Sequence, residues 1–140
     1  MPTSKEFTIR MQDQPGTLGK TCRALADRGV NILGFQSFPA DAGESEVRLV
    51  ADNPTITKSV LESQGLATSE ADVVQVKLPH RPGELARAAS RLGEANININ
   101  YTYCGLEPGT NTPLVFFGVA EVGQAVEILD QLAAAAAAGT

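Results

Sequence analysis

Apolar and polar residues alternate along residues 5–11, which is the pattern of a strand with one buried face. Apolar residues then recur at helical spacing over residues 18–26, and Gly29 follows where a left-handed residue would end a helix. The segments 30–38 and 46–51 are rich in β-branched and aromatic residues, and turn-forming residues separate them. The pattern therefore predicts a strand, a helix and two further strands.

A second helix is predicted after Asn53, because Pro54 suits the first position of a helix and Gly65 would end it. Residues 66–78 then have the pattern of an extended segment. This segment can serve as the last strand of one structural unit and as the first strand of the next.

The second half of the chain shows the same order of elements. We predict a helix over residues 84–94, strands near 97–104 and 114–120, and a helix over residues 122–132. The alanine run 133–138 has the highest helix propensity available and no strand character, so it is expected to extend the last helix. A strand occupies the corresponding place in the first half.

Two segments repeat with a constant offset. Residues 13–18, with the sequence DQPGTL, match residues 80–85, with the sequence HRPGEL. The same offset places residues 29–32 on residues 96–99. The repetition predicts two copies of one unit with no linker between them.

The predicted fold class is α+β, with two ferredoxin-like βαββα(β) units at residues 1–70 and 71–140. Such an order of elements folds as an antiparallel sheet with both helices on one face. The second unit is expected to lack its final strand, because residues 133–138 favour a helix. A unit of about 65 to 70 residues buries little surface alone, so each unit is expected to gain contacts from its twin.

The strand predicted near residues 114–120 is apolar on both of its faces. Val115, Phe117 and Val119 lie on the face opposite Leu114 and Phe116. Part of the second sheet is therefore expected to be covered on both sides. A second copy of the chain, in a homodimer, is the simplest cover.

The chain has 140 residues, of which 43% are hydrophobic, and its 11 Lys plus Arg and 16 Asp plus Glu give a net charge of −5. Nucleic acids and anionic membranes are excluded as expected partners, because their binding energy comes from Lys and Arg. Residues 1–11 lack the apolar stretch of a signal peptide, and no window approaches the roughly 20 apolar residues that span a bilayer. We expect a cytoplasmic protein.

The sequence contains no recognisable catalytic, metal or cofactor motif. His80 is the single histidine, and no phosphate loop or nucleophile beside a base is present. Cys22 and Cys104 have no C-x-x-C spacing and are interpreted as small buried hydrophobes. We therefore expect no enzyme activity, no metal site and no cofactor.

The repeated turns at residues 13–16 and 80–83 lie between a strand and a helix. At such a turn the first N–H groups of the helix lack intrahelical partners and can receive a carboxylate. Proline fixes the entry to the helix, and glycine lets a ligand or another backbone approach. The ammonium group of a free amino acid could then meet Asp13 and an asparagine oxygen.

The motif D-x-P-G-x-L at residues 13–18, followed by a helix and by G-V-N-I at residues 29–32, resembles the signature of the ACT domain. This family comprises amino-acid-binding regulatory units of enzymes of amino-acid metabolism. The resemblance covers nearly the whole chain and implies a tandem of ACT units with the ligand at the interface between units. His80 departs from the Asp or Asn usual at its position, which puts the equivalence of the two sites in doubt.

The resemblance and the turn chemistry together give twelve candidate ligand-binding residues: Asp13, Gln14, Gly16, Thr17, Leu18 and Asn31 in the first copy, and His80, Arg81, Gly83, Glu84, Leu85 and Asn98 in the second. Simpler roles stay open for several of them. Asp13 can cap the helix, His80 can be a surface turn residue and Arg81 can be solvated. Asn31 and Asn98 can serve simply to bond backbone at a strand start, without contacting a ligand.

The resemblance implies a non-catalytic regulatory module that binds a free amino acid between its units. The alternative is a regulatory subunit that acts on an enzyme of amino-acid metabolism through protein contacts and binds no metabolite.

Overall fold

The structure, a computed structural model, describes residues 3–138 and contains six strands and four helices in that range. The elements in chain order are β1 (Thr3–Gln12), α1 (Thr17–Asp27), β2 (Ile32–Pro39), β3 (Glu44–Ala51), α2 (Pro54–Ser63), β4 (Ala67–Lys77), α3 (Glu84–Glu94), β5 (Tyr101–Leu106), β6 (Pro113–Gly118) and α4 (Val122–Ala138). The paired strands are antiparallel, so the predicted α+β class is confirmed.

The chain divides into two compact units. We call residues 5–71 the N-terminal unit, and we call residues 72–140 together with residues 1–4, as far as they are described, the C-terminal unit. Each unit is described separately below.

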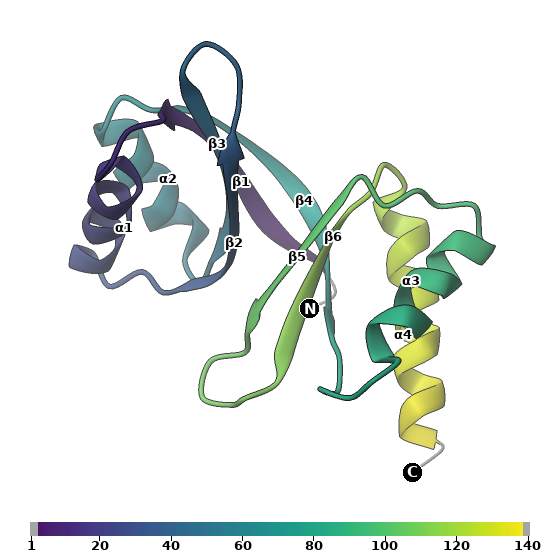
Figure 1. Cartoon of the computed structure of the whole chain (residues 1–140). Coiled ribbons are helices and arrows are strands. Elements are labelled where there is room, and N and C mark those ends of the chain that lie inside the picture. The colour runs from purple at the N-terminus through teal and green to yellow at the C-terminus, as the bar shows by residue number, and fades with distance from the viewer. Residues whose placement is uncertain (1–2, 139–140) are drawn as a thin grey trace. The chain divides into compact units, whose positions relative to one another are not determined.

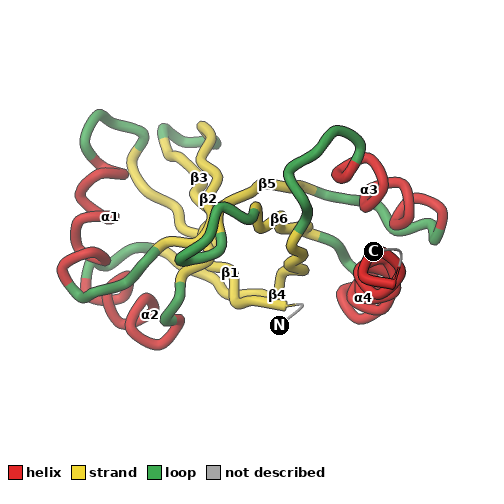
Figure 2. Tube along the Cα trace, turned by 90° about the horizontal axis from the view of Figure 1, so that it is seen from below, coloured by secondary structure: helices red, strands yellow, loops and turns green. Residues whose placement is uncertain are grey.

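In the N-terminal unit, β3 lies between β1 and β2 and pairs antiparallel with both. Helices α1 and α2 cover the same face of this sheet (Figures 1 and 2). The period-two pattern of β1 points Phe7 and Ile9 at the helices, where both side chains are fully buried. They pack there with Leu25 of α1, Leu49 of β3 and Leu61 of α2.

The C-terminal unit repeats this arrangement, with β6 between β4 and β5. Helices α3 and α4 lie together on one side of its strands (Figure 1). Its core joins Val74 of β4, Leu92 of α3, Phe117 of β6 and Leu129 of α4. The order of strands around the central strand is therefore the same in both units.

Several predicted boundaries agree with the structure. Helix α3 covers residues 84–94 as predicted, and residues 67–77 form one uninterrupted strand. The alanine run continues α4 as far as Ala138, and Gly139 lies outside the described residues. Within residues 3–138, no strand follows α4.

Strand β5 begins later than predicted, at Tyr101 instead of residue 97. After the end of α3, Asn96 takes the left-handed φ of 61° that Gly29 takes, at 75°, after α1. The N–H of Asn96 donates to Gly93 O at 2.9 Å, which keeps the chain in the helix-ending turn. Asparagine tolerates this conformation better than other residues with a side chain, so it replaces glycine here.

Both faces of β6 are buried within the single chain. Val115 and Phe117 belong to the core beneath the helices. Leu114 and Phe116 point to the other face and are also buried, and the Phe116 ring stacks on Tyr103 at 5.1 Å between centroids. The apolar pattern of β6 thus needs no second copy to explain it, and the homodimer stays a prediction.

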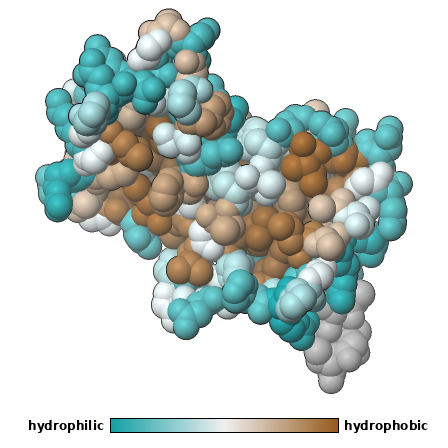
Figure 3. All heavy atoms as spheres, in the orientation of Figure 1, coloured by the Kyte–Doolittle hydropathy of each residue, from teal (hydrophilic) through white to brown (hydrophobic). Residues whose placement is uncertain are grey.

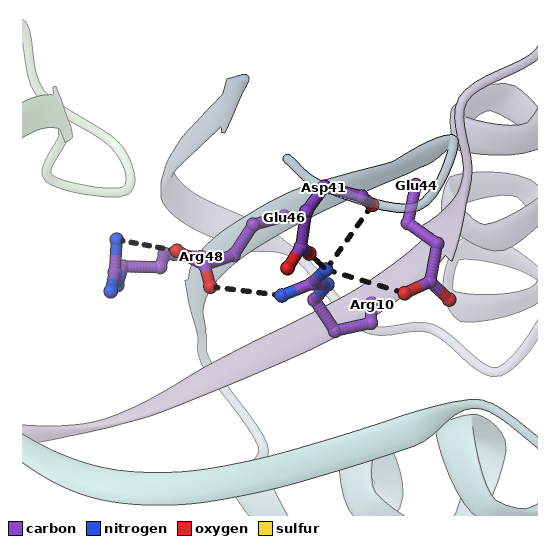
Figure 4. A network of polar contacts seen from close by, with 5 residues as sticks. All are labelled: Arg10, Asp41, Glu44, Glu46 and Arg48. Atoms are coloured by element: carbon purple, nitrogen blue, oxygen red, sulfur yellow. Dashed lines mark hydrogen bonds and ion pairs between the residues drawn. The ribbon is translucent and has the colours of Figure 1, made fainter. Parts of the chain in front are cut away.

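A salt bridge ties the hairpin loop of each unit to its first strand. In the N-terminal unit, Arg10 of β1 binds Asp41 of the β2–β3 loop and lies 3.3 Å from Glu44 (Figure 4). In the C-terminal unit, Lys77 at the end of β4 binds Glu107 of the β5–β6 loop. These hydrogen bonds hold the pKa of Asp41 and of Glu107 below the ordinary carboxyl values.

The surface includes exposed apolar area, part of which is visible in Figure 3. Among the residues whose burial the structure describes, four large apolar side chains are exposed by a third or more: Phe35, Phe38, Leu85 and Leu106. In the described part of the chain, no helix has the length and apolar character that a membrane crossing requires.

Candidate functional site

The two repeated turns have the same backbone. Gly16 and Gly83 each precede a helix with φ of 90°, and their ψ values are −15° and −11°. The N–H of Thr17 donates to Gln14 O at 3.3 Å, and the N–H of Glu84 donates to Arg81 O at 3.4 Å. A Cβ added at either glycine would meet no atom within 4 Å, so the backbone conformation, not crowding, requires glycine.

No side chain caps the first turn of α1 or of α3. The capping role considered for Asp13 is therefore wrong. Its carboxylate instead accepts a hydrogen bond from Ser45 Oγ at 2.8 Å, and its N–H donates to Gly43 O at 3.0 Å. Asp13 is exposed, and its side chain contacts Ser45 at the start of β3.

The turn of the C-terminal unit carries a charged cluster that the N-terminal turn lacks. Glu84 is the first residue of α3, where the helix dipole favours an acid, and it is only 8% exposed. Its Oε1 lies 3.1 Å from Nη2 of Arg81 and 3.7 Å from Nη2 of Arg87. Both arginines are more than half exposed, so each guanidinium keeps contact with solvent.

A cavity of about 290 Å³ lies against this cluster. Its charged end is formed by Arg81 and Glu84, and His80 also lines the cavity. Its apolar walls are formed by Leu78, Pro79, Leu85, Tyr103, Pro113 and Val115. Four candidates from the sequence, namely His80, Arg81, Glu84 and Leu85, are thus brought together around one cavity.

Residues of β5 complete the cavity, and sequence reasoning missed them. Thr102 and Cys104 both line it, and the Thr102 hydroxyl donates to Phe116 O at 2.9 Å. Cys104 is exposed, so its interpretation as a buried hydrophobe is wrong. The only available signal was the period-two alternation that places residues 102 and 104 on one face of a strand.

The N-terminal unit has a smaller crevice of about 190 Å³ between α1 and its sheet. All of its lining residues are uncharged: Leu18, Cys22, Ile32, Phe35, Val47 and Leu49. Leu18 is the only candidate residue of the first copy among them. Cys22 is half-buried, and burial raises the pKa of its thiol.

The candidate asparagines lie far from the turns of their own units. In the N-terminal unit, Gln12 pairs with Glu44 at one end of β3, while Ile32 pairs with Ala51 at the other end. Asn31, which precedes Ile32, donates its N–H to Asp52 Oδ1 at 3.0 Å. An eight-residue strand spans about 25 Å, so Asp13 and Asn31 of one unit cannot contact one small ligand.

The C-terminal unit separates its candidates in the same way. The N–H of Leu78 donates to Pro113 O at one end of β6, and the N–H of Asn100 donates to Gly118 O at the other end. The Asn98 side chain donates to Asn100 Oδ1 at 3.0 Å and is exposed. A site that combines a turn with an asparagine therefore requires residues from more than one unit, and this combination stays a prediction.

The described residues contain no group of three or more His, Cys, Asp or Glu side chains placed to hold a metal ion.

Comparison with known proteins finds a family model that matches part of the chain. Residues 6–62 match the model of the ACT domain, which confirms the resemblance drawn from the sequence over that segment. A stretch of 70 residues is 31% identical to D-3-phosphoglycerate dehydrogenase from Methanocaldococcus jannaschii. That match covers 50% of this chain and 13% of the dehydrogenase, so it spans only a small part of that enzyme.

Solved structures share the fold of nearly the whole chain. A protein from Bacteroides thetaiotaomicron is 22% identical with a TM-score of 0.80, and the match covers 93% of this chain and 88% of that one. The regulatory subunit of aspartate kinase from Thermus thermophilus is 18% identical with a TM-score of 0.63, and the match covers 93% and 91% of the two chains. At these identities the likeness establishes the fold alone.

Proposed function

We propose that this chain is a regulatory module of two ACT units that binds a free amino acid against the β4–α3 turn. The observation that carries the proposal is the cavity at that turn, where a charged end meets apolar walls. Ligand pockets of this kind combine mostly apolar walls with a few polar groups that fix orientation.

The charged end suits both charges of an amino acid. Arg81 has five N–H donors and contacts Glu84 through one nitrogen, so donors remain for a ligand carboxylate. The ligand ammonium can meet the carboxylate of Glu84. Charge-assisted hydrogen bonds contribute about 1.5–3 kcal/mol each, so two or three of them, less the ordering cost, suit an affinity between about 1 mM and 1 μM.

The proposed role is regulatory and not catalytic. The ACT match and the likeness to regulatory subunits of aspartate kinase support this role. The partner would be an enzyme of amino-acid metabolism, and the proposed location is the cytoplasm. The resemblance also implies that a second unit completes each site, and the distance between turn and asparagine within one unit supports that requirement.

A thermal-shift screen of the twenty amino acids tests the proposal. A ligand that binds the native state raises its stability by about 2.7 kcal/mol at one hundred times Kd, so one or a few amino acids should give a rise in Tm that grows with ligand concentration. Arg81→Gln should raise the Kd obtained from that response by about 10 to 100-fold, because a charge-assisted hydrogen bond to the ligand is lost. Arg23→Gln removes an exposed arginine of α1 and should leave the response unchanged.

The alternative function is a subunit that acts only through protein contacts. The exposed side chains of Phe35 and Phe38 on β2 favour it, because exposed apolar residues are common at interfaces. No thermal response to any amino acid at about 10 mM would reject amino-acid binding and favour this alternative. Light scattering during size-exclusion chromatography tests the proposed homodimer separately.

A further inference from the structure

We infer that the cavity of the C-terminal unit selects a neutral amino acid with an apolar side chain and that the N-terminal crevice takes no amino acid. The inference rests on the proposed function and specifies its ligand class and its stoichiometry. It follows from the distribution of charge in the two cavities.

The walls beyond the charged end are mostly apolar, and the polar groups among them are those of Thr102, Tyr103 and Cys104. Leu78, Leu85 and Val115 are aliphatic, and the Thr102 hydroxyl already donates to Phe116 O. A polar or charged side chain placed there would lose its hydration with few hydrogen bonds to compensate. An apolar side chain instead gains from burial, at about 10 to 200-fold in affinity for each methylene.

The charges at the turn also disfavour a basic ligand. Glu84 is the single carboxylate of the lining, and two guanidinium groups already lie within 4 Å of it. The ammonium group common to all amino acids would use the remaining capacity of this carboxylate. A second cation, on the side chain of lysine or arginine, would meet Arg81 and Arg87 without an acid to pair with.

The N-terminal crevice has the apolar walls without the charged end. Thr17 stands at the position of Glu84, and Gln14 stands at the position of Arg81. Neither residue lines the crevice, and Asp13 is hydrogen-bonded to Ser45. The zwitterionic end of an amino acid would therefore be buried there without a countercharge, which is unfavourable. Of these two cavities, only that of the C-terminal unit is therefore expected to bind an amino acid.

Calorimetric titration of the full chain tests the inference. The panel compares leucine, isoleucine, valine, methionine and phenylalanine with serine, aspartate and lysine. We expect one ligand per chain and at least a tenfold tighter Kd for the best apolar ligand than for serine.

Two variants test the two cavities. Leu85→Asn changes a wall residue that is 51% exposed, so the fold should tolerate the substitution. The Kd of the apolar ligand should rise by about tenfold or more. The matched control is Phe35→Asn, which changes an exposed wall residue of the N-terminal crevice and should leave the Kd unchanged.

The failures of the inference and of the proposed function are distinguishable. If serine or lysine binds as tightly as leucine and Arg81→Gln abolishes that binding, the module senses an amino acid but the inferred ligand class is wrong. The inference of a single site would be overturned by two ligands per chain, or by equal losses of affinity in Leu85→Asn and Phe35→Asn. If no amino acid binds at all, the proposed function itself fails.

Discussion

The β1–α1 turn and the β4–α3 turn have matching backbones and different surroundings. Both place a glycine at φ 90° before the helix, and both close with the same backbone hydrogen bonds. Yet only the second turn borders a cavity with a charged end, because Arg81 and Glu84 replace Gln14 and Thr17. Repetition of the fold therefore does not imply repetition of the binding chemistry, which depends on side chains that the repeat does not preserve.

The family signature and the cavity lie in different units. The segment that matches the ACT model, residues 6–62, contains Asp13, whose carboxylate is held by Ser45. The unit with His80, which departs from the family pattern, carries the larger cavity. A departure from a family motif can thus accompany a better formed pocket.

The largest expected effect tests whether the two cores are equivalent. Leu25 and Leu92 occupy matching positions on α1 and α3 and are fully buried. Leu25→Ala and Leu92→Ala should each lower the free energy of unfolding by about 2–5 kcal/mol, measured by urea denaturation. The exposed Leu85→Ala is the control, at about 0.5 kcal/mol or less. A loss below about 1 kcal/mol for one core variant would break the equivalence.

The next effect tests the shared turn backbone. Gly16→Ala and Gly83→Ala should each cost about 1–2 kcal/mol, because a side chain is strained at φ 90°. Gly19→Ala serves as the control, since Gly19 lies within α1 with open space for a Cβ and should gain about 0.5–1 kcal/mol. Unequal costs at Gly16 and Gly83 would show that the turns are not energetically alike.

A smaller effect tests the acid at the helix start. Thr17→Glu supplies α1 with the first-turn acid that α3 has in Glu84, and it should gain about 0.3–1 kcal/mol in the free energy of unfolding. Thr17→Gln is the matched uncharged control and should change little. A gain that persists in 1 M salt would argue against the helix dipole as its cause.

The smallest effect concerns the two hairpin salt bridges. Because Arg10 lowers the pKa of Asp41 and Lys77 lowers that of Glu107, each carboxylate contributes stability that is present above about pH 4 and is lost as the pH falls through its folded pKa. Asp41→Asn and Glu107→Gln should therefore weaken the acid dependence of unfolding. Asp41 is exposed and Glu107 is partly exposed, so high salt should reduce the difference from the parent protein. If both variants keep the pH dependence of the free energy of unfolding of the parent protein, the two salt bridges are not a source of stability.

The sequence alone determined the local structure of this protein well. Helix α3, the continuous β4 and the extension of α4 follow from periodicity, helix propensity and the placing of Pro and Gly. The left-handed conformation of Gly29 was likewise predicted. These features depend on residues within a few positions of one another, where backbone preferences act directly.

Tertiary structure alone decided the chemistry around the turns. The partner of Asp13 is Ser45, 32 positions away, and the cavity beside Arg81 is closed by residues of β5 and β6. The exposure of Cys104 and the separation of Asn31 from Asp13 also depend on strand register. Register and packing arise from contacts between segments distant in the chain, which a local pattern of residues does not encode.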